Sequence, residues 1–209
     1  LILFGYLLIT VLASTGILNP FYLQIFEQIG INIILAVGLN LIVGFSGQFS
    51  LGHAGFMAIG AYAVAIMGSK SPTYGAFFIA MLVGAVLAGA VALLVGIPTL
   101  RLKGDYLAIA TLGVSEIIRI LIVNGGELTN GAAGILSIPP FTSWQLVYAF
   151  VVITTILTLN FLRSPIGRST LSVREDEIAA ESVGVNTTKI KVIAFVFGAI
   201  TASIAGSLQ

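Results

Sequence analysis

Long apolar stretches separated by short polar breaks make up most of this chain. Seven of them approach the length of a membrane-spanning helix, which needs about 20 mostly apolar residues. They cover residues 1–18, 21–43, 53–68, 74–97, 106–123, 144–162 and 192–209. Each is unbroken, whereas a strand of a membrane barrel alternates apolar and polar residues over about ten positions. The pattern predicts an all-α, polytopic transmembrane helix bundle of about seven spanning or partly spanning helices, in a single domain over residues 1–209.

The breaks between these stretches contain residues that end helices. They are Asn19-Pro20, Ser71-Pro72, Pro98, Asn124-Gly125-Gly126 and Pro139-Pro140. The chain starts at Leu1, without a methionine and already inside an apolar stretch, so we expect it to be a piece of a longer protein. Stretch 1–18 lacks the basic region and the small-residue cleavage site of a signal peptide, and is therefore predicted to span the membrane.

Composition agrees with a membrane protein. The 209 residues are 58 % hydrophobic and 8 % charged, against about 25 % charged residues in a typical soluble domain. The absence of cysteine excludes disulfides and thiolate metal sites, and a single histidine excludes a His-rich metal site. We expect no metal and no cofactor, and a net charge of +1 gives no indication of nucleic-acid binding.

Lysine and arginine are distributed unevenly among the connections. Segment 124–143 has none, segment 98–105 has two, and segment 163–191 has five. Because cytoplasmic loops carry an excess of these residues, the last two segments are predicted to face the cytoplasm and segment 124–143 to face outward. The polar break at 44–52 then lies at the cytoplasmic side or folds back into the membrane.

Small residues recur every fourth position in two stretches. This spacing lets helix backbones approach closely in lipid and predicts two helix contact faces. The residues are Gly84, Ala88, Ala92 and Gly96 in one stretch, and Gly198, Ala202 and Gly206 in the other.

The sequence "GFSGQFSLGHAGF" at 44–56 forms a soft, polar, uncharged break between two very apolar stretches. Irregular backbone at membrane depth is tolerated only where protein buries it or where it lines a water-filled cavity, and broken helices often mark transport sites. The alternative is an ordinary cytoplasmic loop with His53 at the start of the next helix. Under the first interpretation, the candidate pathway residues of this region are Asn40, Gly44, Ser46, Gln48, Ser50, Gly52 and His53.

Charged and amide side chains also occur within the spans. Glu116 lies about 15 Å into its stretch, close to the midplane, with Arg119 three positions later on the same face. The two form either an ion pair that fixes helix packing or, with Glu116 as a further pathway residue, a proton relay or substrate contact. A broad arc of the second stretch either lines a pathway or bonds to neighbouring helices; it holds Gln24, Glu27, Gln28 and Asn32.

Segment 163–191 contains nine of the seventeen formal charges. It begins with a predicted turn at 164–167, followed by a short acidic helix that Gly184 ends. Such a helix can dock in a groove of a partner protein. The alternative, a solvated loop, is less consistent with its length, because most connections are far shorter.

Segment 163–191 resembles the cytoplasmic EAA-type coupling loop of ABC importer permeases, in which an Ala-Ala pair is followed four residues later by Gly, as Ala180 and Gly184 are here. Ile178 stands where the family usually has an acidic residue, and Glu177 comes one place earlier. The resemblance implies that this loop docks on an ATPase subunit. The contact residues it implies are Arg174, Glu175, Asp176, Glu177, Ala179, Ala180, Glu181 and Gly184.

Three further motifs, "LNLIVGFSGQFSLGHAGFMAIGAY", "RLKGDYLAIATLGVSEIIRI" and "LTNGAAGI", are similar to the LivM-type permeases of branched-chain amino acid importers. The resemblance implies a multi-pass permease in the plasma (inner) membrane of a bacterium or archaeon. It would form the translocation pathway with a sister permease as a heterodimer, driven by two ABC ATPase subunits and supplied by an extracytoplasmic substrate-binding protein. The substrate would be a branched-chain or related hydrophobic amino acid.

Two other functions stay open at this point. A proton-coupled secondary transporter of small polar or amino-acid substrates would use Glu116 or His53 as its relay. An intramembrane enzyme would need a nucleophile beside a base, and Ser50 and His53 are three positions apart. The chain contains no Gly-x4-Gly-Lys-Ser/Thr phosphate-binding loop, so we expect it not to be an enzyme and ATP hydrolysis to reside in separate subunits.

Overall fold

The computed structural model describes residues 10, 19–102, 104–135 and 140–209, and within them it contains helices and no strands. The predicted span 1–18 therefore lies almost wholly outside the described residues. The helices are α2 (Pro20–Asn40), α3 (His53–Lys70), α4 (Tyr74–Thr99), α5 (Asp105–Val123), α6 (Trp144–Arg163), α7 (Pro165–Glu175), α8 (Glu177–Ser182) and α9 (Thr187–Leu208). A π-helical turn, Leu41–Phe45, extends α2, and two 3-10 turns, Gly126–Leu128 (η2) and Gly131–Ala133 (η3), follow α5.

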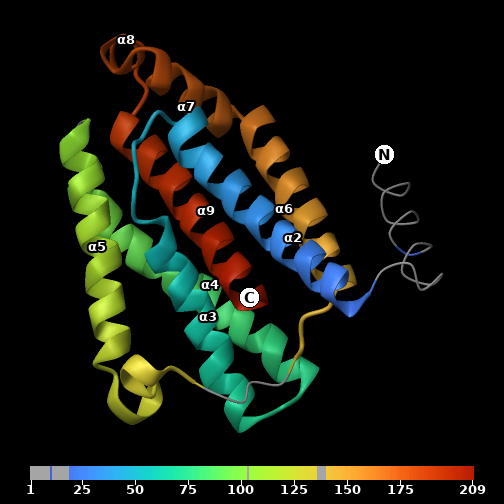
Figure 1. The fold of residues 1–209 in the computed structure, drawn as a ribbon. Helices are drawn as coiled ribbons and strands as arrows, with labels where there is room; N and C mark the ends of the chain where they lie inside the picture. Colours follow the sequence, from blue (N-terminus) through green and yellow to red (C-terminus); the bar gives the residue numbers. More distant parts are fainter. Residues whose placement is uncertain (1–9, 11–18, 103, 136–139) are drawn as a thin grey trace.

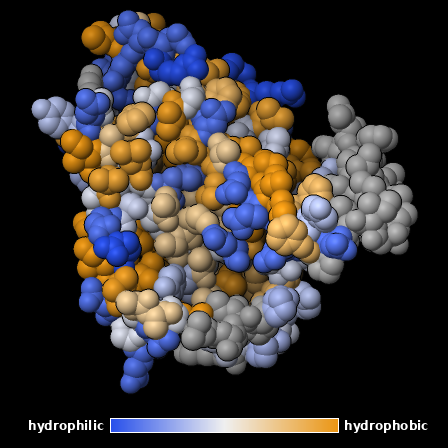
Figure 2. All heavy atoms as spheres, viewed as in Figure 1, coloured by the Kyte–Doolittle hydropathy of each residue, from blue (hydrophilic) through white to orange (hydrophobic). Residues whose placement is uncertain are grey.

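The predicted all-α polytopic bundle is confirmed. Five helices in the described part of the chain are long and apolar enough to cross a membrane, and α3 is a shorter apolar helix. Figure 2 shows apolar side chains along the bundle on the face in view and polar ones around α7 and α8. The many large apolar side chains that are exposed on the spans agree with a lipid-facing surface.

Most predicted helix ends agree with the structure, and two differ. The break expected at Pro98 falls after Thr99, because a proline in the last turn removes only one backbone donor. Helix α9 begins at Thr187 rather than at residue 192. Its first turn is polar, and the Asn186 side chain caps it by accepting a hydrogen bond from the Lys189 backbone N–H at 2.9 Å.

Helix α9 lies at the centre of the bundle, between α2 on one side and α3 and α4 on the other (Figure 1). Both predicted small-residue faces are buried there. A Cβ atom on Gly60 would collide with the Ser203 carbonyl, and one on Gly206 with the Met57 carbonyl. The α3 and α9 backbones therefore pack directly on each other. In lipid the burial of apolar surface contributes little to helix association, so close van der Waals packing of this kind holds the helices together.

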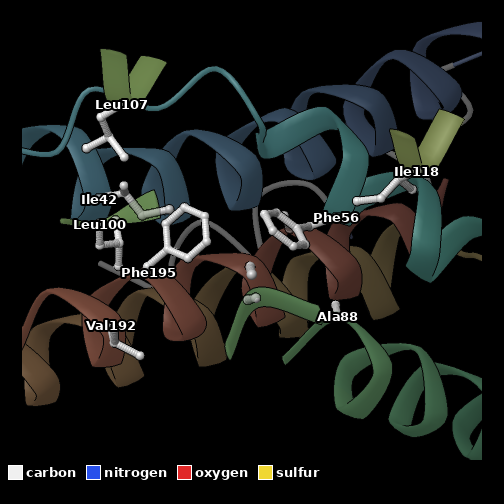
Figure 3. Packing of buried hydrophobic residues seen from close by; sticks show 11 residues of the cluster. Ile42, Phe56, Ala88, Leu100, Leu107, Ile118, Val192 and Phe195 are labelled. Atoms are coloured by element: carbon white, nitrogen blue, oxygen red, sulfur yellow. The ribbon is translucent and has the colours of Figure 1, made fainter. Parts of the chain in front are cut away.

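The largest buried side chains join these helices. Phe56 of α3 and Phe195 of α9 meet edge to face with ring centroids 5.6 Å apart (Figure 3). Ile42, Leu100, Leu107 and Ile118 belong to the same cluster, which therefore joins α2, α4 and α5 to the central pair. This core fixes the position of the polar break, because Ile42 lies just before the break and Phe56 is its last residue.

The helix ends form two groups. One, which we call the α8 end, contains α7, α8, the start of α9 and the ends of α2, α4 and α6. The other, the η2 end, contains η2, η3, the α3–α4 connection and the end of α9. Arg101 and all five basic residues of segment 163–191 belong to connections or helix ends at the α8 end. The basic connections and segment 124–143, which has no lysine or arginine, therefore belong to opposite ends of the bundle, as predicted.

Candidate functional site

The polar break begins with a π-helical turn. The Ser46 backbone N–H donates to the Leu41 carbonyl at 3.1 Å, five residues back, and the Gln48 N–H donates to the Ile42 carbonyl at 3.1 Å. Such turns inside or at the end of α-helices frequently occur at functional sites. Gly47 follows with φ +66°, and the Arg174 side chain lies where a Cβ atom at Gly47 would point. Glycine is favoured here because the backbone has positive φ and because the Arg174 side chain leaves no room for a Cβ atom.

After Gly47 the chain does not remain at the α8 end as an ordinary loop would. It runs beside α9 into the bundle, and α3 begins there, at His53, well below the end of α2 (Figure 1). The interpretation of an irregular segment packed within the bundle therefore agrees with the structure. We call residues 46–52 the crossing segment.

Side chains of the crossing segment alternate between inside and outside. Ser46, Gln48 and Ser50 are buried, and Gln48 is only 2 % exposed. Phe49 and Leu51 are 53 % and 50 % exposed. Polar groups thus face the protein and apolar groups face outward, which suits a segment between a helix bundle and lipid.

The buried groups tie the crossing segment to two helices. Gln48 Nε2 donates to Ser46 Oγ and, at 3.1 Å, to the backbone carbonyl of Lys191 in α9. The Leu51 backbone N–H donates to Thr111 Oγ1 of α5 at 3.0 Å. Gly52 packs against the Thr111 carbonyl, from which a Cβ atom would be only 2.6 Å away.

The other predicted pathway residues lie in different places. Asn40 is exposed at the end of α2, with its amide against Gly44. His53 lies close to Gly38 of α2, and its two ring nitrogens are buried. Ser50 Oγ accepts a weak bond from the Gly52 N–H at 3.4 Å, and no bond joins Ser50 to His53. The pairing that an intramembrane enzyme would need is not formed in this part of the chain.

Glu116 is not part of this cluster. It forms the predicted ion pair with Arg119, whose Nε donates to Glu116 Oε1 at 3.1 Å and to Oε2 at 2.9 Å. The two side chains are 52 % and 65 % exposed, respectively, on the outer surface of α5. The pair therefore does not fix packing among the described helices. Both side chains are accessible to the surroundings of α5.

The charged segment forms two helices instead of the predicted turn and single helix. Pro165 occupies the first turn of α7, and the capping Ser164 Oγ accepts from the Gly167 N–H at 3.1 Å. Asp176 then separates α7 from α8. It caps α8, because its Oδ1 accepts hydrogen bonds from the Ile178 N–H at 2.9 Å and the Ala179 N–H at 3.0 Å. Gly184, with φ +88°, follows the end of α8, as predicted.

Most predicted contact residues of segment 163–191 are exposed, with two exceptions. Ala180 is buried within the chain, and Glu177 turns toward Lys191, whose Nζ lies 2.6 Å from Glu177 Oε1. The sequence analysis missed Ile178 and Val183, which are 77 % and 78 % exposed. Two large apolar residues, one in a short charged helix and one directly after it, were the signal that could have identified them.

Segment 163–191 and the crossing segment meet directly. Arg174 Nη1 donates to the Gly44 carbonyl at 2.9 Å, across 130 positions of sequence, and Gly44 belongs to the π-helical turn that leads into the crossing segment. Lys191 pairs with Glu177 of α8 through its ammonium and accepts from Gln48 through its carbonyl. We call these three contacts the junction. The two features that the sequence analysis treated separately form one bonded unit.

Comparison with known proteins places the chain in a family. The profile of the family described as "Branched-chain amino acid transport system / permease component" matches residues 21–209. The LivM permease proteins of the high-affinity branched-chain amino acid transport systems of Escherichia coli (strain K12) and Salmonella typhimurium (strain LT2) are 38 % and 36 % identical over 188 residues, covering 73 % of this chain and 44 % of each relative.

A probable LivM permease of Methanocaldococcus jannaschii is 26 % identical over 144 residues, covering 64 % of this chain and 42 % of the relative. The chain thus spans less than half the length of the curated relatives it matches. No solved structure matches it. Because the family profile matches nearly all of the chain and the described helices include five potential spans, the chain belongs to the permease-component family of branched-chain amino acid transport systems.

Proposed function

We propose that this chain is part of a permease subunit of an ATP-driven importer of branched-chain amino acids. The subunit lies in the plasma membrane of a bacterium or archaeon with its α8 end toward the cytoplasm. It forms the translocation pathway with a sister permease, receives substrate from an extracytoplasmic binding protein, and is driven by two ABC ATPase subunits. Family membership supports the transport class, and the basic residues at the α8 end support the orientation.

The junction is the observation that supports ATP-driven transport most directly. An ATPase can open a permease only if movement at its docking surface reaches the backbone beside the pathway. Here α7 bonds to Gly44 through Arg174, and α8 bonds to Lys191 through Glu177. Lys191 in turn accepts a hydrogen bond from Gln48 of the crossing segment. A displacement of α7 and α8 would therefore pull on the crossing segment without any intervening loop.

The ATPase would dock on the exposed surface of α8 and its flanks. Ile178 and Val183 supply apolar anchors for a groove, and the charged residues around them supply its rim. Helix α5 would face the sister permease. An exposed ion pair near the middle of a membrane is costly against lipid, so Glu116 and Arg119 are better placed against water or a polar protein surface.

Docking can be tested with the full-length protein co-expressed with its partners. In Ile178→Asp/Val183→Asp we expect co-purified ATPase to fall at least tenfold. Leu128→Asp is the matched control, because Leu128 is similarly exposed (65 %) but lies at the η2 end. Equal ATPase recovery from the double variant and the control would overturn the proposed docking surface.

A proton-coupled transporter remains the second candidate because the two ring nitrogens of His53, a titratable group, are buried within the bundle. The two functions are separated by uptake into energised vesicles. Uptake that stops on ATP depletion and continues after collapse of the proton gradient supports the importer, whereas the reverse supports proton coupling.

A further inference from the structure

The last turn of α2, Leu41–Phe45, holds one residue more than an α-helical turn. The Ser46 backbone N–H donates to the Leu41 carbonyl at 3.1 Å, which is five residues back. In an α-helix this bond spans four residues, so the Phe45 N–H would occupy that carbonyl instead. A change of the turn from the π form to the α form would therefore shift the chain after it by one residue, which is about 1.5 Å along a helix axis and about 100° around it.

The end of this turn is bonded to a residue of another helix. The last carbonyls of a helix have no N–H partner within the helix. Here the Gly44 carbonyl accepts a hydrogen bond at 2.9 Å from Arg174 Nη1 of α7. A guanidinium is favourable at this place because the carbonyl end of a helix carries a partial negative charge. Arg174 thus caps α2 from α7, as basic side chains near the end of a helix can cap their own helix.

The aliphatic part of Arg174 packs against the chain that leaves the turn. Its Cγ lies 2.9 Å from the place that a Cβ atom at Gly47 would occupy. Its Nε donates to Glu175 Oε1 at 3.0 Å, which orients the guanidinium. One side chain therefore contacts the turn at Gly44 and the chain after it at Gly47. Both contacts fit the π form, and a shift of one residue would displace Gly47 from the Arg174 side chain.

The crossing segment depends on the form of the turn. In the π form the Gln48 amide meets the Lys191 carbonyl of α9. A shift of one residue would place Gly47 or Phe49 at that point, and neither side chain can donate the bond. The form of the last turn of α2 thus decides whether the crossing segment keeps its bond to α9.

We propose that Arg174 is a positioning residue: it holds the last turn of α2 in the π form, and withdrawal of α7 lets this turn become α-helical and shifts the crossing segment by one residue. The inference rests on the proposed function and deepens it, because it identifies the two-state element on which a movement of α7 would act. It also gives Arg174 a role within its own chain, whereas the resemblance to coupling loops implies a contact with an ATPase.

The test measures a distance across the turn. Ile33 of α2 and Phe49 of the crossing segment are 42 % and 53 % exposed, and the 209-residue sequence contains no cysteine. Spin labels are attached at Ile33→Cys and Phe49→Cys in the full-length protein, after any cysteines elsewhere have been replaced. The distance between the labels is measured in the assembled importer by double electron–electron resonance. We expect one distance without nucleotide and a second, distinct distance with a non-hydrolysable ATP analogue.

Changing the guanidinium gives the decisive comparison. Arg174→Met keeps most of the aliphatic stem and removes the donor, so without nucleotide we expect at least half of the molecules to show the second distance. Arg174→Lys keeps a charged donor and should retain the first distance. Arg168→Met is the control and should also retain it, because Arg168 lies on the same helix and its Nη1 donates to the Arg163 carbonyl, at the end of α6, at 2.9 Å.

Four results would overturn the inference: an unchanged distance with the ATP analogue, an unchanged distance in Arg174→Met, a new distance in Arg174→Met that differs from the one with the analogue, or the same change in Arg168→Met. Loss of ATPase subunits from Arg174→Met with the first distance unchanged would make Arg174 a docking contact instead. The comparison of variants without nucleotide needs no ATPase. It therefore tests the turn even if uptake that survives ATP depletion rejects the proposed function.

Discussion

The side chain of Gln48 donates a hydrogen bond to the backbone carbonyl of Lys191 at 3.1 Å, across 143 positions of sequence. Gln48 belongs to the crossing segment and Lys191 to the first turns of α9, where its ammonium also reaches Glu177 of α8. Lys191 thus contacts both the crossing segment, through the Gln48 side chain, and α8, the helix proposed to meet the ATPase. The coupling mechanism proposed above depends on this relationship.

Removing the Gln48 side-chain amide should uncouple the importer. In Gln48→Leu the buried hydrogen bond is lost, at a cost of about 0.5–1.5 kcal/mol in stability, so the protein should still assemble. We expect substrate-stimulated ATP hydrolysis to continue while uptake falls at least tenfold. Parallel assays of hydrolysis and uptake in proteoliposomes check this, and an unchanged ratio of the two rates would contradict it.

The Lys191–Glu177 ion pair should contribute to the same coupling. Its side chains are only 12 % and 26 % exposed, so Lys191→Met and Glu177→Gln should be non-additive by about 0.5–3 kcal/mol in a double-mutant cycle of unfolding free energy. Lys189→Met is the matched control, because Lys189 is exposed two positions earlier. Additive effects within error would show that the pair does not hold α8 to α9.

Gly52 should tolerate no side chain. Its Cβ position is occupied by the Thr111 carbonyl of α5, so Gly52→Leu must displace the crossing segment from α5. We expect uptake to be abolished while ATPase subunits still co-purify. Gly113→Leu is the control, because Gly113 lies on α5 with open space around it. Normal uptake by the Gly52 variant would argue against a role for the crossing segment.

The α5 ion pair should matter for assembly with the sister permease. Arg119→Gln leaves the exposed Glu116 carboxylate without its partner, and an uncompensated charge on a spanning helix is costly. We expect less sister permease to co-purify, with recovery in the charge-swapped variant Glu116→Arg/Arg119→Glu. If the single and swapped variants co-purify as well as the unmodified protein, α5 does not face the sister subunit.

Much of the fold could be predicted because a segment that spans a membrane must be long, apolar and internally hydrogen-bonded, which favours a helix. Long apolar stretches bounded by Pro or Gly predicted most of the helices. The small residues at 84, 88, 92 and 96 predicted a helix face that is buried in the structure. The start of α9 was missed because its first turn is polar and carries no apolar signal. The start of α7 was missed because Ser164 and Pro165 are consistent with either a turn or a helix start.

The candidate site was only partly predictable for a different reason. Spacing could indicate that Gln48 and Ser50 share a face in extended backbone, but not which element they face. The partners of Gln48 and Gly44 lie more than 100 positions away, and no local pattern specifies such pairings. For the same reason the burial of Ala180 within its own chain was not predicted.

The central claim, that the crossing segment moves with α7 and α8, is tested most directly by a distance measurement in the assembled importer. Spin labels at Phe49→Cys and Leu112→Cys occupy exposed positions on the crossing segment and α5. The account predicts that the distance between them changes between the nucleotide-free and ATP-bound states, and that the change disappears when Gln48→Leu is added. An unchanged distance in the two states, or a change that persists in Gln48→Leu, would contradict it.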